Sequence, residues 1–286
     1  MKNQNTELEE GKIGKIFFQY ALPAIIATTA TSLYNIIDRI FIGQGVGPMA
    51  ISGLALTFPL MNLAVALGTL VGAGASTIVS IRMGEKRRAD AIRTLGNAFV
   101  LNTIIGITFS IVSLLFLDSL LVLFGASEQT LPYARDFMTI ILLGNVITHI
   151  FFGLNNIIRA SGYPTKAMVS ILLTVTINIF LAPVFIFIFK WGIRGAATAT
   201  VLSQLVGMIW VLSHFMSKKP YIHFMKSGFK LSRRIISDIF AIGLSPFLIH
   251  VCACLVAIFI NLQLKQYSGD MAIGAFGIIN SIVSLI

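Results

Sequence analysis

Long apolar runs alternate with short polar segments along the whole chain. Six runs lack Asp, Glu, Lys and Arg, and each exceeds the roughly 20 residues that a helix needs to cross the hydrocarbon core of a bilayer. They cover residues 53–81, 95–117, 137–158, 167–189, 195–217 and 239–264. A seventh run, 16–42, contains Asp38, and an eighth begins at Met271 and is still apolar at Ile286. The pattern predicts an all-α polytopic membrane protein.

The composition and the first run support this prediction. Of the 286 residues, 56% are hydrophobic and only 11% are charged, which is far more apolar surface than a soluble domain of this size can bury. The first run is too long for a secretory signal peptide, and the tail before it carries Glu7, Glu9 and Glu10. We therefore expect the first helix to be retained in the membrane.

The net charge of +10 is distributed unevenly between the two sides of the predicted bilayer. With the N-terminus inside, sixteen of the 21 Lys and Arg residues fall in inside segments and five fall outside. This positive-inside bias predicts a multi-pass protein of the plasma membrane with a cytoplasmic N-terminus. The basic charge then indicates contact with anionic lipid headgroups, and we expect no nucleic-acid partner.

The last part of the chain resembles its own beginning. Matching residues keep their order: Ile16, Phe17 and Pro23 recur as Ile239, Phe240 and Pro246, and residues 47–51 recur as 269–273. In the same frame Asp38 falls on Asn261. Between the two copies lies a basic segment, 218–234, with Pro220 and Gly228, which we interpret as a cytoplasmic linker.

Because six spans precede the restart, both copies enter the membrane from the same side and are parallel repeats. We expect a six-helix N-terminal lobe over residues 1–217, the linker over 218–234, and the first one or two helices of a second six-helix lobe over 235–286. A complete second repeat would need a chain of roughly 430–460 residues, so we expect this sequence to be a truncated form.

Asp38 is the most informative polar residue, since a carboxylate in a membrane span is costly to bury and by default marks a path for ions or protons. Tyr34 and Asn35 precede it by four and three residues, so the three side chains can line one stripe of a helix. An alternative interpretation is that Asp38 and Arg39 only mark the outer membrane interface.

Two later spans carry polar stripes with a spacing of four residues. They are Thr174, Asn178 and Ala182 in the fifth span, and Ala196, Thr200 and Gln204 in the sixth. Such groups either hold helices together through uncharged hydrogen bonds or line a cavity shared with Asp38. Pro23 and Pro183 lie inside spans. A proline there removes one backbone hydrogen bond of the helix and leaves a carbonyl group without its partner. Such a carbonyl can line a cavity, or the proline can simply kink the helix.

The histidines give no sign of a metal centre. His149, His214 and His250 lie within spans, and no two of them have the spacing of metal ligands. We predict no metal site and interpret these residues as helix-packing residues.

Several segments, in this order, resemble the multidrug and toxic compound extrusion (MATE) family, and most closely its bacterial DinF-like and multidrug-exporting branch. They are Tyr34-Asn35-Ile-Ile-Asp38 through Gly43; Gly72-Ala-Gly74-Ala-Ser76 through Ser80-Ile-Arg82-Met-Gly84; Arg159-Ala-Ser-Gly162; Asn178-Ile-Phe-Leu-Ala182-Pro183; and Gly195-Ala-Ala-Thr-Ala-Thr200. Together they cover the first six spans.

The resemblance implies a cation-coupled antiporter of the bacterial inner membrane. It would export small amphipathic, often cationic compounds by alternating access between two lobes, as a monomer, with H⁺ or Na⁺ as the coupling ion and no other cofactor. Carried over residue by residue, the family's ion site corresponds to Asp38, Asn178, the position of Ala182, and Thr200. From the polar stripes and prolines of the spans we expect the supporting cavity residues to be Tyr34, Asn35, Ala182 and Gln204, and the hinges to be Pro23 and Pro183.

Ala182 departs from the family pattern, which has Asp just before this proline. The apolar spans of the lobe are left with one carboxylate, whereas a dehydrated sodium ion needs several oxygen ligands and compensating charge. A lone Asp38 can still carry a proton, so we favour proton coupling.

Two other functions fit the sequence less well. A lipid-linked oligosaccharide flippase of the same superfamily would favour a strongly cationic central cavity, and charged residues are nearly absent from these spans. An intramembrane aspartyl protease needs two facing aspartates, one of them in Gly-x-Gly-Asp. The nearest segment, residues 267–270, lacks the first glycine. We therefore predict that the chain is not an enzyme.

Overall fold

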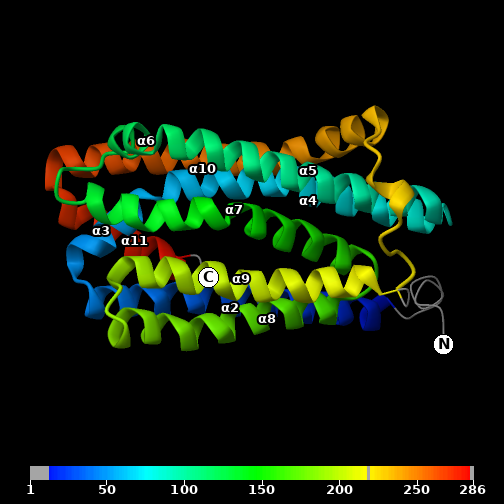
Figure 1. Ribbon diagram of the computed structural model, residues 1–286, viewed down its shortest axis with the longest axis horizontal. Helices are drawn as coiled ribbons and strands as arrows, with labels where there is room; N and C mark the ends of the chain where they lie inside the picture. The colour runs from blue at the N-terminus through cyan, green and yellow to red at the C-terminus, as the bar shows by residue number, and fades with distance from the viewer. Residues whose placement is uncertain (1–12, 218–219, 284–286) are drawn as a thin grey trace.

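The apolar runs form helices that lie along the long axis of the molecule (Figure 1). The computed structural model describes residues 13–217 and 220–283. The long helices are α2 (Ile13–Gly45), α4 (Phe58–Gly84), α5 (Arg88–Leu115), α7 (Leu131–Ala160), α8 (Pro164–Pro183), α9 (Gly192–Met216) and α10 (Arg233–Ser268), and the π-helix η1 (Val184–Ile188) extends α8. In the described part of the chain, seven helical segments are long and apolar enough to cross a membrane. The chain is a multi-pass membrane protein.

Shorter helices lie between the spans. They are α3 (Pro48–Leu56), α6 (Leu117–Leu123), the 3-10 helix η2 (Lys226–Phe229) and α11 (Asp270–Val283). The second apolar run was expected to form one span from residue 53, and this boundary was wrong. Residues 53–56 belong to α3, and α4 begins after Thr57. Each of these helices has a proline in its first turn, where the missing N–H has no helical partner to lose.

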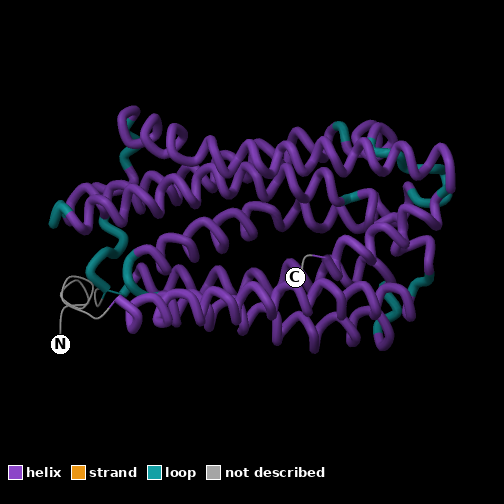
Figure 2. The backbone as a smooth tube through the Cα atoms, turned by 180° about the vertical axis from the view of Figure 1, so that it is seen from behind, coloured by secondary structure: helices purple, strands orange, loops and turns teal. Residues whose placement is uncertain are grey.

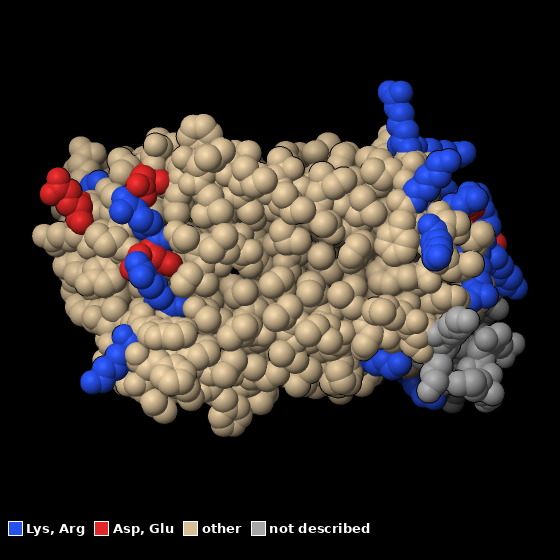
Figure 3. Space-filling model, viewed as in Figure 1, with Lys and Arg blue, Asp and Glu red and all other residues tan. Residues whose placement is uncertain are grey.

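Charged side chains gather at the two ends of the bundle and leave an apolar band between them (Figure 3). The end near the N-terminus carries mainly Lys and Arg in this view, whereas the opposite end carries both signs. At the mixed end Arg135 is paired with Asp118 and Arg194 with Asp136. The visible surface therefore has the form of a belt for lipid chains with two polar rims.

The linker region is bound to the bundle through Asn97 of α5. The Asn97 amide donates to the carbonyl oxygens of Gly228 and Lys230, both at 3.1 Å, and its oxygen accepts from the Ser232 N–H at 2.8 Å. Arg88 Nε donates to the Tyr221 carbonyl oxygen at 2.7 Å. The described part of the linker is thus packed on the basic end of α5, and Figure 2 shows its loop segments beside the helix ends.

The internal repeat is visible in the local structure. Helix α2 contains Pro23 and is followed by Gly47 with φ 115°, after which α3 begins. Helix α10 contains Pro246 and is followed by Gly269 with φ 76°, after which α11 begins. A φ in this range favours glycine, so both turns need the residue that the sequence repeats at that point.

The repeated helices pack against the first part of the chain through backbone contacts. A Cβ at Gly243 would lie 1.9 Å from the Leu70 carbonyl oxygen, and one at Gly74 would lie 2.1 Å from that of Ile239. Helix α10 therefore touches α4 directly along these glycines, as small residues allow in membrane helix pairs. At the opposite end, the Ser127 hydroxyl donates to Asp270 Oδ2 at 2.6 Å.

Candidate functional site

Asp38 is buried in α2, with 7% of its surface exposed. Its Oδ1 atom is enclosed and has no hydrogen-bond partner among the described residues. Arg39 beside it is equally enclosed, with its guanidinium 4.9 Å from the centre of the Phe58 ring. Two charges at an exposed membrane interface would be hydrated, and these two side chains are instead surrounded by protein.

Next to Asp38 on α2, Tyr34 joins a hydrogen-bonded cluster with two other predicted site residues. The Tyr34 hydroxyl lies 3.1 Å from Thr200 Oγ1, and the Asn178 amide donates to the same oxygen at 3.2 Å. Thr200 donates its own proton to the Ala196 carbonyl oxygen at 3.1 Å. Helices α2, α8 and α9 therefore meet at one hydroxyl group.

The bonding capacity of Thr200 decides what else can bind there. A hydroxyl group has one donor and two acceptor positions. Thr200 uses the donor on Ala196 and both acceptor positions on Tyr34 and Asn178. A sodium ion could therefore be coordinated by Thr200 only after one of these hydrogen bonds had broken.

The cluster lies in the wall of a small cavity of about 40 Å³. Its lining residues are Thr31, Tyr34, Phe151, Phe152, Ile171, Thr174, Val175, Asn178, Thr200, Ser203 and Gln204. That volume suffices for about one or two water molecules. Asp38 lies one turn beyond Tyr34 on the same face of α2 and is not part of this lining.

Gln204, a predicted supporting residue, lines the same cavity, and Ala182 does not. Gln204 Oε1 accepts a hydrogen bond of 2.5 Å from the Thr148 hydroxyl. Ala182 is fully buried and packs in an apolar cluster that includes Ile42, Ile186 and Ala196. The predicted stripe of Thr174, Asn178 and Ala182 therefore reaches the cavity only with its first two members.

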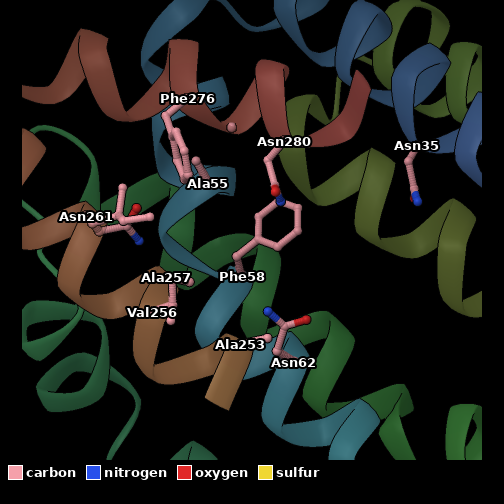
Figure 4. A pocket seen from close by; sticks show the side chains of 12 residues that line it. Asn35, Ala55, Phe58, Asn62, Ala253, Val256, Ala257, Asn261, Phe276 and Asn280 are labelled. Atoms are coloured by element: carbon pink, nitrogen blue, oxygen red, sulfur yellow. The ribbon is translucent and has the colours of Figure 1, made fainter. Parts of the chain in front are cut away.

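Asn35 lies in a different cavity, so the stripe expected for Tyr34, Asn35 and Asp38 is divided between two sites. This second cavity has a volume of about 530 Å³ and lies among α2, α3, α4, α10 and α11 (Figure 4). Four asparagines from four helices line it: Asn35, Asn62, Asn261 and Asn280. Phe58 and Phe276 add aromatic surface.

The asparagine-lined cavity has no charged side chain among its described lining residues. Asn261, the repeat counterpart of Asp38, is 2% exposed, and its Nδ2 atom has no hydrogen-bond partner within residues 13–217 and 220–283. Sequence reasoning did not select Asn62 or Asn280. Both asparagines lie inside apolar runs, and this could have identified them as cavity residues, because polar residues in membrane spans tend to face other helices or cavities.

The two predicted hinge prolines differ in their surroundings. Pro23 is buried within the continuous helix α2. Pro183 is the last residue of α8, and the chain continues as the π-helix η1. A π-helical turn often marks a functional position in a helix. The change in helix type follows Pro183, one residue after Ala182, the position at which the family pattern has an acidic residue.

The fold and these cavities define the class of the protein as a multi-pass helical membrane protein with buried polar sites between its spans. The family model described as MatE matches residues 23–184, which is more than half of the chain. The chain belongs to the MatE family. This confirms the resemblance that the sequence motifs indicated.

Individual relatives support the same assignment. The chain is 30% identical over 270 residues to "Multidrug export protein MepA" of Staphylococcus haemolyticus, and the match covers 94% of this chain and 60% of that protein. The solved structure of "MATE multidrug transporter DinF-BH" matches with 31% identity and a TM-score of 0.92, over all of this chain and 64% of that one. An outward-facing "multidrug resistance MATE family transporter" matches with 26% identity and a TM-score of 0.86, over 100% of this chain and 66% of that one.

The chain thus spans about 60% of the length of the curated relatives that it matches. These relatives are named as export proteins and transporters rather than enzymes. On that ground the prediction that the chain is not an enzyme is confirmed.

Proposed function

We propose that the chain acts in proton-coupled export of small amphipathic, often cationic compounds across the bacterial inner membrane. The proposal assigns the six spans within residues 1–217 to a first lobe, 218–234 to a cytoplasmic linker and 235–286 to the beginning of a second lobe. Its N-terminus lies in the cytoplasm, it works as a monomer, and transport proceeds by alternating access between lobes.

The observation that carries the proposal is the state of Asp38. A carboxylate surrounded by protein, with one oxygen that has no hydrogen-bond partner among the described residues, has a free position for a proton. Burial of such a group in a membrane span is costly and is retained where ions or protons move. The MatE family assignment and the names of the relatives support export as the process that this group serves.

The surroundings of Asp38 favour a proton over sodium. Sodium needs several oxygen ligands, yet Thr200 has all three of its bonding positions in use and Ala182 supplies no side-chain oxygen. In this proposal Asn178, Thr200, Tyr34 and Gln204 hold the shape of the site around Asp38. They are neutral neighbours and not the ion ligands that the family resemblance implied.

The asparagine-lined cavity is the proposed site for the exported compound. Its aromatic surface suits flat amphipathic molecules, and its amide groups provide both donors and acceptors. A flippase for lipid-linked oligosaccharides would need cationic groups for the diphosphate, and the described lining has no Lys or Arg. The comparisons with named multidrug exporters also do not favour the flippase.

A gradient experiment tests the proposal. The 286-residue chain is reconstituted in liposomes, and movement of a cationic rhodamine dye is followed by fluorescence while a pH gradient and a sodium gradient are imposed separately. We expect the pH gradient to drive movement of the dye and the sodium gradient at equal pH to have no effect. Movement driven by sodium alone would contradict proton coupling, and no movement under either gradient would contradict the export activity.

A further inference from the structure

His149 in the middle of α7 has an arrangement that packing alone does not explain. Only 2% of the residue is exposed, and neither Nδ1 nor Nε2 has a hydrogen-bond partner in the described part of the chain. A neutral imidazole ring offers one donor and one acceptor. A buried donor and acceptor without partners are costly in free energy, and in native structures such groups often bind a ligand or a water molecule.

Two glycines make room for this ring. A Cβ at Gly68 of α4 would lie 3.5 Å from His149 Nδ1, and a Cβ at Gly106 of α5 would lie 3.5 Å from His149 Cβ. Any larger residue at Gly68 would extend toward the ring nitrogen. The imidazole is therefore held between α4 and α5, where both ring nitrogens are enclosed and have no hydrogen-bond partner among the described residues.

His149 also lines a pocket of about 220 Å³ between α4 and α7. Its lining residues are Met61, Ala64, Val65, Gly68, Thr69, Asn145, Thr148, His149, Phe152 and Asn156. An engineered apolar cavity of about 150 Å³ is large enough to bind benzene. The pocket beside His149 therefore has room for an aromatic ring with a polar substituent.

Two other polar residues of the pocket, Asn145 and Thr148, already form hydrogen bonds within the protein. The Asn145 amide donates to the Gly106 carbonyl oxygen at 3.3 Å, and the Thr148 hydroxyl donates to Gln204. No Asp, Glu, Lys or Arg occurs among the described lining residues, so a charged ligand group would be left without a counter-charge. The remaining hydrogen-bonding groups of the lining are uncharged: the side chains of Thr69 and Asn156 and the imidazole of His149, whose nitrogens have no partner among the described residues.

We propose that the pocket between α4 and α7 binds uncharged aromatic molecules that carry a hydroxyl or similar group, and that His149 forms the hydrogen bond to that group. The aromatic part lies against Phe152, Met61 and Val65 in this arrangement. The site is separate from the asparagine-lined cavity, with which it shares no lining residue. Its place as a subsite for exported compounds rests on the proposed export function, but the binding itself does not.

The pocket is adjacent to the small cavity at Thr200. Phe152 lines both of them, and the hydrogen bond from Thr148 to Gln204 joins a residue of one lining to a residue of the other. A ligand in the pocket lined by His149 therefore lies against residues that also line, or are hydrogen-bonded to, the small cavity at Thr200. No gradient is needed for this contact, so it can be tested by binding alone.

The test measures equilibrium binding to the full chain in lipid nanodiscs, with binding to empty nanodiscs subtracted. Three ligands share a ring system: 2-naphthol with a hydroxyl group, naphthalene without one, and trimethyl(2-naphthyl)ammonium with a fixed positive charge. We expect His149→Phe to weaken 2-naphthol binding about tenfold, the upper part of the range for one hydrogen bond, and to leave naphthalene binding unchanged. The cation should bind more weakly than 2-naphthol.

Three further variants control for misfolding and for position. His149→Gln keeps a donor and an acceptor and should restore 2-naphthol binding to within about threefold of the wild type. His250→Phe changes a histidine of α10 outside the pocket and should have no effect. Val65→Trp fills the exposed edge of the pocket and should weaken 2-naphthol and naphthalene together.

The proposal is overturned if His149→Phe binds 2-naphthol as the wild type does, if it loses naphthalene to the same extent, or if the charged ligand binds best. None of these results depends on transport. A failure of dye movement in liposomes with the expected naphthol results would remove the export function and leave the His149 site in place.

Discussion

Helices α2 and α10 begin alike and differ in what they bury. Each is a long apolar helix with an internal proline, followed by a glycine with positive φ and a shorter helix. At equivalent positions α2 has Asp38 and α10 has Asn261, both nearly enclosed. Each side chain has one polar atom, Oδ1 of Asp38 and Nδ2 of Asn261, without a hydrogen-bond partner in the described residues.

The surroundings give these two similar positions different uses. Tyr34, one turn before Asp38, belongs to the cluster that joins α2 to α8 and α9 through Thr200. Asn261 lines the large cavity, and its helix is fixed to α4 by direct backbone contact. The repeated local structure thus creates two equivalent buried positions, one in α2 and one in α10. The residue placed there, acid or amide, decides whether it suits a proton or a neutral hydrogen bond.

The largest expected effect comes from removing the acid from α2. Asp38→Asn makes the two repeats alike and takes away the only proposed proton carrier. We expect proton-driven movement of the rhodamine dye to fall at least tenfold, a loss of about 1.4 kcal/mol or more in the coupled step. Glu85→Gln, which changes an exposed carboxylate in the turn after α4, is the matched control and should retain transport. Full transport by Asp38→Asn would remove the functional difference between the helices.

The next effect concerns how α10 is held. Gly243→Ala places a methyl group against the Leu70 carbonyl oxygen and should lower the free energy of unfolding by about 1–3 kcal/mol through overpacking. The measurement is the thermal unfolding midpoint in detergent. Gly84→Ala, where the added Cβ meets no atom of the described structure within 4 Å, should be neutral or slightly stabilising. Equal midpoints for the two variants would show that close contact with α4 does not distinguish α10.

A smaller effect is expected from restoring the acid that the family pattern has beside Pro183. Ala182→Asp places a carboxylate in a fully buried apolar cluster, and Asp38 is the one Asp or Glu that is buried among the described residues. Sodium should then stabilise the variant by about 1.4 kcal/mol when present at tenfold over its Kd, and leave the wild type unchanged. Thermal unfolding in NaCl, compared with choline chloride, measures this difference. A variant that unfolds at the same temperature in both salts would count against the role given to position 182.

The smallest effect is expected from replacing the side-chain amide of Asn261 in α10. Asn261→Leu removes an unsatisfied buried donor and should raise the free energy of unfolding by about 1 kcal/mol. Asn155→Leu is the contrast, because the Asn155 amide donates to the Ala167 carbonyl oxygen at 3.0 Å and to Ser170 Oγ at 2.6 Å. That variant should lose about 1–3 kcal/mol. A loss of the same size in Asn261→Leu would mean that the Asn261 amide is satisfied in the native protein.

Much of the fold followed from the sequence because membrane spans depend on local composition. A run of about 20 apolar residues can satisfy its backbone in a bilayer only as a helix, so every predicted span in the described chain has its helix. The errors were local. The separation of α3 from α4 and the formation of α6 depend on turns within apolar sequence, where the hydropathy pattern does not change.

The sequence predicted the candidate site less completely than the fold. Helical spacing placed Tyr34 and Asp38 on one face and identified Asn178 and Thr200 as polar members of their stripes. Helical spacing could not show that Tyr34 and Asn35, which are neighbours in sequence, line separate cavities. Nor could it distinguish His149 from an ordinary packing histidine, since its unused nitrogens follow from the positions of Gly68 and Gly106 on two other helices.

The sequence by itself determined that the chain crosses the membrane many times, which residues form the spans, that the chain repeats, and that one acid is buried in the first span. These properties depend on the free energy of moving each residue from water into lipid, which adds up along the chain. Only the tertiary structure decided that three helices meet at Thr200, that four asparagines line one cavity and that both ring nitrogens of His149 are enclosed without a partner among the described residues. Between helices there is little difference in hydrophobicity to direct the pairing, so small residues and the shapes of distant segments decide which faces meet.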